Sequence, residues 1–439
     1  MAAYGDMAAW VAVLINALLI AYLALFPAVF ALIVACLVRR LGSVAMLAAP
    51  FVWAATELGR TYLLTGFPWV LLGYSQTRVL PVAQVASLVG VYGLSIVVAS
   101  VSAAVVYGTG SRASGLRAYA PLAVVLASIV AIAGWGSRRV AASAWTRDGD
   151  PIEVGLVQGN VDQGIKWDPS RASAIFQEHV SRTREAVFKG ASLVLWPESS
   201  TPFMFDEDPG GADQLRTLAR QARATLLFGS DQIEWKVVER RRAIDKLFNA
   251  AYVVRPDGGT AGIYRKMHLV PFGEYVPMRR LLFFAAPLTE QVGTFDAGTR
   301  AELLPVDGHR LSVAICYEVV YPDLVRQFVA GGSELLTTIT NDAWFGDTSA
   351  PHQHFEQASM RAIENGRYLV RAANTGISGI VDPYGRVLAE TGVYQPAVVV
   401  GEARFLRTST FYSRHGDFAA YASLVLTALL LVVPRRRVQ

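Results

Sequence analysis

The feature that most constrains this chain is an N-terminal run, Met7 to Val38, that contains no charged residue and ends at Arg39-Arg40. At about 1.5 Å per residue, a helix over this run would extend roughly 48 Å, which exceeds the hydrocarbon core of a bilayer, about 30 Å thick. The run predicts one long or tilted membrane helix bent near Pro27. A tight helical hairpin is the alternative. A cleavable signal peptide is disfavoured because no basic segment precedes the apolar run.

Further apolar segments predict additional membrane spans, near residues 43–64, 79–107, 118–135 and 418–433. Hydrophobic residues make up 53% of the chain and charged residues only 17%, and the apolar surplus is concentrated in these segments. The middle of the chain has the charge density of a water-exposed domain. We therefore expect a transmembrane helical region at 1–148, a globular domain at 149–405, and a C-terminal membrane helix with a basic tail at 415–439.

The arginines predict how the chain is oriented. One side of the predicted spans carries most of them, namely Arg39, Arg40, Arg112, Arg117, Arg435, Arg436 and Arg437, whereas Arg78, Arg138 and Arg139 fall on the other side. By majority, the positive-inside rule places the first group in the cytoplasm and the globular domain in the periplasm or outside the cell. These arginines account for the net charge of +5. No basic helix or finger pattern indicates a nucleic-acid partner.

Two ionisable residues, Glu57 and Arg60, lie within the second predicted span. Their i,i+3 spacing allows them to pair on one helix face. Ionisable residues at this depth mark a functional site by default. The alternative is an interfacial pair near a helix end.

Strands and helices alternate in the globular domain, which is typical of a layered α/β fold. The expected strands are 152–158, 193–196, 225–229, 311–315, 335–340, 377–381 and 398–401. The expected helices are 170–189, 212–223, 322–330 and 352–365.

One of these strands ends at a cysteine, Cys316, just before the helix that Pro322 is expected to begin. The positive end of a helix favours a thiolate over a thiol, so this position suits a nucleophile. A buried structural cysteine is the alternative interpretation. The second cysteine, Cys36, lies in the apolar N-terminal run, so a disulfide framework is not expected.

Two upstream stretches carry further reactive side chains. Leu193 to Trp196 reads as a buried strand, and Pro197 would stop it so that Glu198 can point into a cleft. Lys266 follows a predicted strand end, and Glu274 lies behind a Pro-Phe-Gly turn. A lysine can stabilise a developing oxyanion or lower the pKa of a thiol. Each residue alone fits a solvated loop equally well. His268 has no second histidine at ligand spacing, so neither a metal nor another cofactor is expected.

Together, Trp196-Pro197-Glu198, the segment Arg265–Glu274 and Ile315-Cys316-Tyr317-Glu318 resemble the Glu–Lys–Cys triad of the nitrilase superfamily of carbon-nitrogen hydrolases. The membrane spans before and after the domain narrow the resemblance to the membrane-embedded branch, the apolipoprotein N-acyltransferase family. Further matching stretches are Gly66–Trp69, Val157–Asn160, Asn341–Gly346 and Asn374–Ile377. Members of that family usually begin with more spans. Accordingly, either the coding sequence starts further upstream or this is a shorter variant.

The resemblance implies an αββα sandwich inserted before the last span of a bacterial inner-membrane enzyme. The implied reaction takes an acyl chain from a phospholipid in the bilayer onto Cys316 as a thioester. It then delivers the acyl chain to the α-amino group of an S-diacylglyceryl-cysteine lipoprotein in a ping-pong sequence. Glu198 is implied as the general base and Lys266 as the oxyanion partner. A monomer is expected.

The remaining candidates are supporting residues. Glu274 and Glu318 are expected to orient Lys266 and the substrates, Tyr317 to line the pocket, and Trp344 to position or cover the substrate. An acyltransferase must keep water from its thioester. The candidates for a lid or membrane arm are Phe203, Phe205, Leu282, Phe283 and Phe284, with ordinary core packing as the alternative.

Two other functions fit parts of the pattern. A membrane-tethered nitrilase-type amidase would need a polar, water-filled pocket, whereas the loops here are rich in Phe, Leu and Trp. A non-enzymatic scaffold would be favoured by loss of a triad residue, and all of them are present. A transporter would not explain the triad, and no paired intramembrane repeat is visible.

Overall fold

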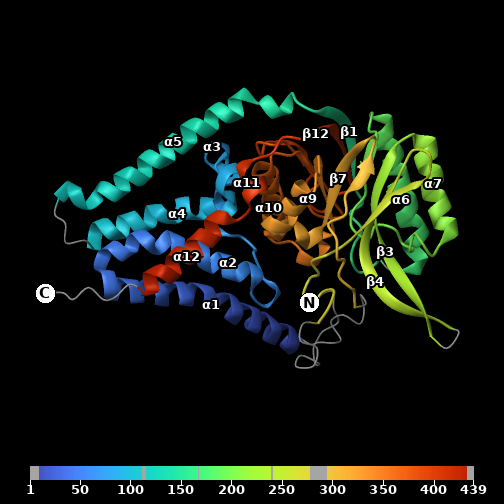
Figure 1. Cartoon of the computed structure of the whole chain (residues 1–439). Coiled ribbons are helices and arrows are strands. Elements are labelled where there is room, and N and C mark those ends of the chain that lie inside the picture. Colours follow the sequence, from blue (N-terminus) through green and yellow to red (C-terminus); the bar gives the residue numbers. More distant parts are fainter. Residues whose placement is uncertain (1–8, 111–114, 167, 239–240, 277–293, 433–439) are drawn as a thin grey trace. The chain divides into compact units, whose positions relative to one another are not determined.

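The computed structural model describes residues 9–110, 115–166, 168–238, 241–276 and 294–432 (Figure 1). It divides into two compact units. The helical unit comprises Trp10–Ala144, Ile363–Asn365 and the segment from Ser409 onward, and the globular unit comprises Trp145–Ala362 and Gly366–Thr408.

The helical unit begins with one long helix, which excludes the hairpin alternative for the N-terminal run. This helix, α1, contains Pro27 in its interior. A kink at Gly90, whose φ is 67°, interrupts α4. The helices of the unit are α1 (Ala9–Leu41), α2 (Ala49–Tyr62), α3 (Leu80–Ala83), α4 (Ala86–Gly110), α5 (Ala120–Ala142), α11 (Phe411–His415) and α12 (Phe418–Val432). Its 3₁₀ turns are η1 (Gly42–Ala48), η2 (Leu63–Thr65), η3 (Leu72–Gln76) and η4 (Gly115–Tyr119), and η5 (Ala144–Thr146) follows α5.

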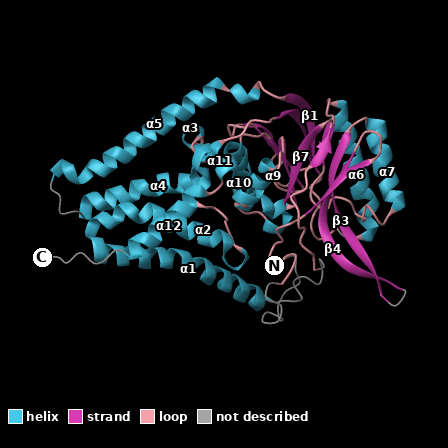
Figure 2. Cartoon of the chain, viewed as in Figure 1, coloured by secondary structure: helices cyan, strands magenta, loops and turns pink. Residues whose placement is uncertain are grey.

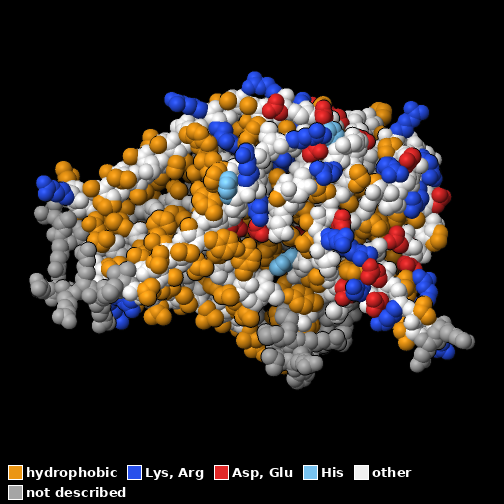
Figure 3. Space-filling model, in the orientation of Figure 1, with side chains coloured by type: hydrophobic (Ala, Val, Ile, Leu, Met, Phe, Trp, Pro, Cys, Tyr) orange, Lys and Arg blue, Asp and Glu red, His pale blue; other side chains and the backbone are white. Residues whose placement is uncertain are grey.

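The composition of these helices suits a lipid environment. Among the described residues, three helical segments, Trp10–Thr65, Ala86–Gly110 and Leu116–Thr146, are long and apolar enough to cross a membrane, and α12 is a shorter apolar helix. Leu18, Leu25 and Leu32 on α1 recur every seventh residue on one helix face and are 52%, 60% and 71% exposed. Figure 3 shows apolar side chains covering the visible surface of the helices. These helices fit the predicted membrane region.

The structure corrects the expected Glu57–Arg60 pair. Among the described residues, the Glu57 side chain accepts a hydrogen bond from the backbone N–H of Leu72 at 2.7 Å rather than from Arg60. The next backbone N–H, that of Gly73, donates to Ser95 Oγ at 2.8 Å. Glu57 therefore holds the turn that opens η3, and this contact is structural.

In the part of the globular unit that the structure describes, the strands form two six-stranded sheets (Figure 2). The strand order of the first sheet is β12-β1-β2-β3-β4-β5. Its strands are β1 (Asp150–Gln158), β2 (Leu193–Leu195), β3 (Thr225–Val238), β4 (Arg241–Val254), β5 (Thr260–Arg265) and β12 (Ala397–Phe405). The order of the second sheet is β11-β10-β9-β8-β7-β6. Its strands are β6 (Leu304–Val306), β7 (His309–Ile315), β8 (Leu335–Thr340), β9 (Leu369–Ala373), β10 (Gly379–Val381) and β11 (Val387–Glu390).

Helices cover the outer face of each sheet. On the first sheet, α6 (Pro169–Phe188) and α7 (Pro209–Ala222) bury apolar side chains in one core with the strands, among them Phe176, Leu215 and Phe228. The second sheet packs with α9 (Pro322–Ala330) and α10 (Ala350–Asn365), whose inward residues include Phe328 and Phe355. The expected αββα sandwich is therefore confirmed.

A buried glutamine bridges the two sheets and accounts for one of the matching sequence stretches. Gln158 ends β1 and is fully buried. Its Oε1 accepts hydrogen bonds from Ser378 Oγ at 2.6 Å and from Thr391 Oγ1 at 2.8 Å, both next to strands of the second sheet. This contact helps to fix the spacing between the sheets at the end where the candidate site lies.

Candidate active site

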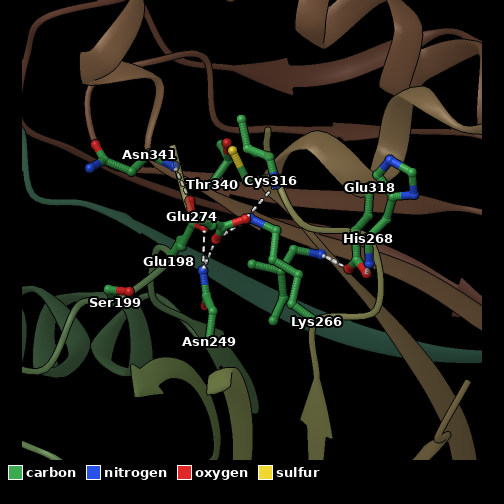
Figure 4. A network of polar contacts seen from close by, with 12 residues as sticks. Glu198, Ser199, Asn249, Lys266, His268, Glu274, Cys316, Glu318, Thr340 and Asn341 are labelled. Carbon is green, nitrogen blue, oxygen red and sulfur yellow. Dashed lines mark hydrogen bonds and ion pairs between the residues drawn. The ribbon is translucent and has the colours of Figure 1, made fainter. Parts of the chain in front are cut away.

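Three side chains that follow strand ends meet in the globular unit (Figure 4). Lys266 directly follows β5 and Cys316 directly follows β7, whereas Glu198 lies beyond the end of β2. The strands β2 and β5 belong to one sheet and β7 to the other. All three residues are buried, with relative exposures of 8% for Glu198, 1% for Lys266 and 8% for Cys316. The structure thus brings together the carboxylate, the ammonium and the thiol that the sequence singled out.

The ammonium group is shared between two carboxylates. Lys266 Nζ lies 3.2 Å from Glu198 Oε1 and 2.8 Å from Glu274 Oε1. Asn249 Nδ2 donates to the same two oxygen atoms, at 2.8 and 2.9 Å. Glu274 Oε2 accepts from the backbone N–H of Val270 at 2.8 Å, which closes its own turn. Glu274 therefore contacts Lys266 directly, and its role in orienting the lysine stays a prediction. Asn249 completes the arrangement and was not foreseen.

Charge pairing sets the protonation of this cluster. Burial alone would raise the pKa of Glu198, but the ammonium groups of Lys266 and Lys166 lower it below its usual value. Burial alone would lower the pKa of Lys266, but the carboxylates of Glu198 and Glu274 hold it well above its usual value. The Glu198 carboxylate and the Lys266 ammonium are therefore both charged at neutral pH.

Cys316 is a thiol rather than a thiolate in the resting protein. Burial, followed by the negative charge of Glu198, raises the pKa of Cys316 to about 12, and Lys266 only partly opposes this. The short 3₁₀ turn η7 (Cys316–Val320) begins at this residue. This corrects the expectation that a helix N-terminus makes Cys316 a thiolate, because burial and the adjacent carboxylate dominate. The thiol therefore needs a base in order to react.

Glu318 ties the lysine loop to the cysteine turn. This fully buried side chain accepts from the Ile315 N–H through Oε2 at 2.7 Å. Its Oε1 accepts from the backbone N–H groups of Met267 and His268 at 2.7 and 3.0 Å, and from Tyr264 Oη at 2.7 Å. One carboxylate therefore positions the segments on either side of Lys266 and Cys316.

Replacing Glu318 by Gln is expected to loosen this tie. Whichever way the amide turns, its NH₂ group faces a backbone N–H, and a buried donor left without an acceptor costs about 1–3 kcal/mol. We expect a lower thermal unfolding midpoint in detergent and a slower reaction at Cys316. Glu402→Gln on β12, where the side chain is 48% exposed, is the matched control. An unchanged midpoint in the Glu318 variant would contradict this role.

The end of β8 supplies a further contact to Glu198. The backbone N–H of Asn341 donates to Glu198 Oε2 at 3.1 Å. The Asn341 side chain is itself held by Gln163 Oε1 at 2.7 Å and by Asn374 Nδ2 at 3.0 Å. Two of the matching sequence stretches, those containing Asn341 and Asn374, therefore serve to place the general-base candidate.

The remaining predicted residues separate into four groups. Tyr317 is buried beside the site, with its ring centroid 6.2 Å from that of His268, whereas Trp344 is 43% exposed. The rings of Phe203 and Phe205 contact Phe176 and Phe228, respectively, which fits the alternative of ordinary core packing. Leu282, Phe283 and Phe284 lie outside the described residues.

Sequence reasoning also missed a second buried lysine. Lys166 is 8% exposed, and its Nζ donates to the backbone carbonyl of Glu198 at 3.2 Å. Burial lowers the pKa of Lys166, opposed by the carboxylates of Glu198 and Asp231. The residue follows β1 in a loop without hydrophobic periodicity, so no pattern singled it out. A small pocket beside Glu198 is lined by Val161, Lys166, Ile175, His179, Pro197, Glu198, Ser199, Ser200, Thr201, Pro202 and Asn374.

The sequence matches two family models. The model of the carbon-nitrogen hydrolase family matches residues 153–407, and that of the apolipoprotein N-acyltransferase N-terminal domain matches residues 1–104. The globular unit is therefore a carbon-nitrogen hydrolase domain of the nitrilase superfamily. Among solved structures, an amidase from Nesterenkonia sp. is similar, with 21% identity and a TM-score of 0.45, over 63% of this chain and 97% of the amidase chain.

Similarity to curated sequences extends over nearly the whole chain. The apolipoprotein N-acyltransferase of Geobacter metallireducens is 39% identical over 99% of this chain and 82% of its own length. That of Methylococcus capsulatus is 34% identical over 95% of this chain and 80% of its own length. The chain belongs to the apolipoprotein N-acyltransferase family and is an acyltransferase.

Proposed function

We propose that this acyltransferase moves an acyl chain from a phospholipid to the α-amino group of the N-terminal S-diacylglyceryl-cysteine of a bacterial apolipoprotein. The intermediate is a thioester on Cys316. The observation that carries the proposal is the buried meeting of a thiol of raised pKa with a charged carboxylate and a charged ammonium. These groups supply a nucleophile, a base and an oxyanion partner.

In the first half of the reaction, Glu198 takes the proton of the Cys316 thiol as the sulfur attacks the ester carbonyl of the phospholipid. The ammonium of Lys266 stabilises the oxyanion of the tetrahedral intermediate. When the intermediate collapses, the carbon–oxygen bond breaks and the protonated Glu198 returns the proton to the leaving alkoxide. A lysophospholipid departs and the thioester remains.

In the second half, the α-amino group of the diacylglyceryl-cysteine attacks the thioester. Glu198 takes a proton from the attacking nitrogen, and Lys266 again stabilises the oxyanion. The carbon–sulfur bond breaks, the proton passes to the sulfur, and the product is an amide. The enzyme returns to its thiol form, which is a ping-pong sequence.

Burial supports transfer rather than hydrolysis. The side chains of Lys266 and Glu198 are 1% and 10% exposed, so the charges that would activate an attacking group are largely shielded from bulk water. The family relationship and the apolar helices support an inner-membrane location. The arginine distribution supports a globular unit on the periplasmic or outer side.

The proposal is tested by supplying both substrates. The purified protein in detergent micelles is incubated with a phosphatidylethanolamine–phosphatidylglycerol mixture and a synthetic S-diacylglyceryl-cysteinyl peptide. We expect an N-acylated peptide and an equal amount of lysophospholipid. Release of free fatty acid without acylation of the peptide would indicate a lipid hydrolase and contradict the proposal.

A further inference from the structure

Next to the nucleophile lies a set of buried ionisable residues that the proposed reaction does not use. Asp342 follows β8, His354 is on α10 and Arg371 is on β9, and all three are fully buried. Arg371 Nη2 donates to Asp342 Oδ2 at 2.8 Å, and Thr340 Oγ1 donates to Asp342 Oδ1 at 2.9 Å. His354 Nδ1 lies 2.9 Å from Asp342 Oδ1 and 3.0 Å from Arg371 Nη2.

A buried ion pair of this kind is weak evidence for stability. Removing two charges from water costs more than their attraction returns unless further contacts satisfy them. Burial would raise the pKa of Asp342, but Arg371 and His354 hold it far below its usual value. The Asp342 carboxylate is therefore a negative charge in the core. Its contacts hold the side chains of Arg371 and His354 in place.

One contact links this set of residues to the backbone of the nucleophile. His354 Nε2 lies 3.2 Å from the backbone carbonyl oxygen of Cys316. A carbonyl oxygen only accepts, so Nε2 must carry the hydrogen. The other ring nitrogen, Nδ1, lies at hydrogen-bond distance from both the Asp342 carboxylate and the Arg371 guanidinium. Asp342 and Arg371 therefore hold the ring in the position from which Nε2 donates to Cys316.

The hydrogen bond from His354 restrains an unusual backbone conformation at Cys316. Its φ is 53°, in the left-handed region that non-glycine residues seldom adopt. The peptide group between Cys316 and Tyr317 is planar, so fixing the Cys316 carbonyl also fixes the Tyr317 N–H, which points the opposite way. The peptide group rotates about the Cα–C bond of Cys316. The Cys316 side chain is attached to that Cα and therefore does not move with the peptide group.

We infer that His354, held by Asp342 and Arg371, is a positioning residue that fixes the Cys316–Tyr317 peptide group in the orientation required for acyl transfer. This inference rests on the proposed role of Cys316 as the nucleophile.

A glycine in one of the matching sequence stretches supports the inference. A Cβ on Gly376 would lie 2.1 Å from Asp342 Oδ2, far closer than atoms can approach. The loop that carries Gly376 therefore packs directly against the carboxylate. Arg371 Nε also donates to the Ile377 carbonyl at 3.1 Å, so the same loop holds both members of the ion pair.

The test compares two variants of His354. In His354→Gln the amide retains an N–H donor for the Cys316 carbonyl, whereas His354→Met has similar bulk and no donor. Two rates are measured for each: thioester formation with the phosphatidylethanolamine–phosphatidylglycerol mixture, by intact mass, and iodoacetamide alkylation of Cys316, by peptide mass spectrometry. Alkylation removes the same thiol proton but forms no oxyanion, so it does not depend on the peptide orientation.

For the Met variant we expect thioester formation to slow by about 100-fold, as is typical when a reacting geometry shifts by about 1 Å. Alkylation should stay within about threefold of the wild-type rate, and the Gln variant should recover most of the acylation rate. Equal loss in both variants, parallel loss of alkylation, or an unaffected Met variant would each overturn the inference. If the wild-type protein forms no thioester, the proposed function fails and the inference falls with it.

Gly376→Ala disturbs the same set of residues through Asp342 and leaves His354 unchanged. The added methyl group must displace the Asp342 carboxylate, so we expect the same split between slowed acylation and retained alkylation. Gly134→Ala, at an exposed position of α5 where a Cβ meets no atom within 4 Å, is the control for adding a methyl group. An acylation rate for Gly376→Ala equal to that of the control would overturn the inference.

Discussion

Glu198→Gln is expected to slow thioester formation at Cys316 by about 10³-fold, within the range of about 10²–10⁴ that general-base catalysis contributes. The thiol has a pKa of about 12, so almost none of it is ionised at neutral pH without a base. The Gln amide keeps the shape of the side chain but cannot take the proton. Glu185→Gln on the exposed face of α6, where the side chain is 48% exposed, is the matched control.

The pH dependence separates this role from a structural one. Because the pKa of Glu198 is lowered, the wild-type base stays charged from neutral pH down to its usual carboxyl range, and the rate should fall only below that range. In the Gln variant, only direct ionisation of the thiol forms the nucleophile. Its rate should therefore rise about tenfold per pH unit while the pH stays below the thiol pKa. A variant whose rate is independent of pH in alkaline buffer would contradict the assignment.

Lys266→Met is expected to impair both the reaction and the fold. Loss of the oxyanion partner should slow thioester formation by about 10²–10³-fold. The substitution also removes the ammonium group that lies between the Glu198 and Glu274 carboxylates, and breaking such a buried arrangement typically costs about 3–5 kcal/mol. The pKa of one carboxyl group should rise until it is neutral. We therefore expect a lower thermal midpoint as well as a lower rate.

A double variant separates the two effects of the lysine. In Lys266→Met with Glu274→Gln, one of the two opposed carboxylates is gone, so much of the lost stability should return. The rate should stay low because no ammonium faces the oxyanion. Lys189→Met on α6, where the side chain is 48% exposed, serves as the control. Recovery of the rate together with the stability would show that Lys266 acts only structurally.

The sequence was sufficient to predict features that depend on local pattern. The strands ending near Glu198 and Cys316 are short apolar runs, and the predicted bounds of β8 and α9 match the structure. The layered fold followed from the alternation of such runs with helical segments. Lys266 and Glu274 came from a loop with little pattern of its own, and the family resemblance singled them out.

Features that depend on pairing across the chain were not predicted. The strand expected to end at Gly229 continues to Val238, because its polar half pairs with β4 through contacts such as Lys236–Asp245 and Arg242 over Trp235. Asn249 lies on that unforeseen partner strand. His354 lies on a helix that was expected, but its fully buried position depends on packing against the second sheet. The raised thiol pKa likewise depends on burial, which no local pattern indicates.

The most direct test of a Cys316 acyl-enzyme is the mass of the intact protein after incubation with the phosphatidylethanolamine–phosphatidylglycerol mixture. The mass is predicted to increase by one fatty acyl group, which hydroxylamine removes and which Cys316→Ala does not acquire. Adding the diacylglyceryl peptide should discharge the acyl group onto the peptide amine. Transfer of acyl chains to the peptide by Cys316→Ala at the wild-type rate, or a wild-type protein that acylates the peptide without ever carrying the adduct, would contradict the account.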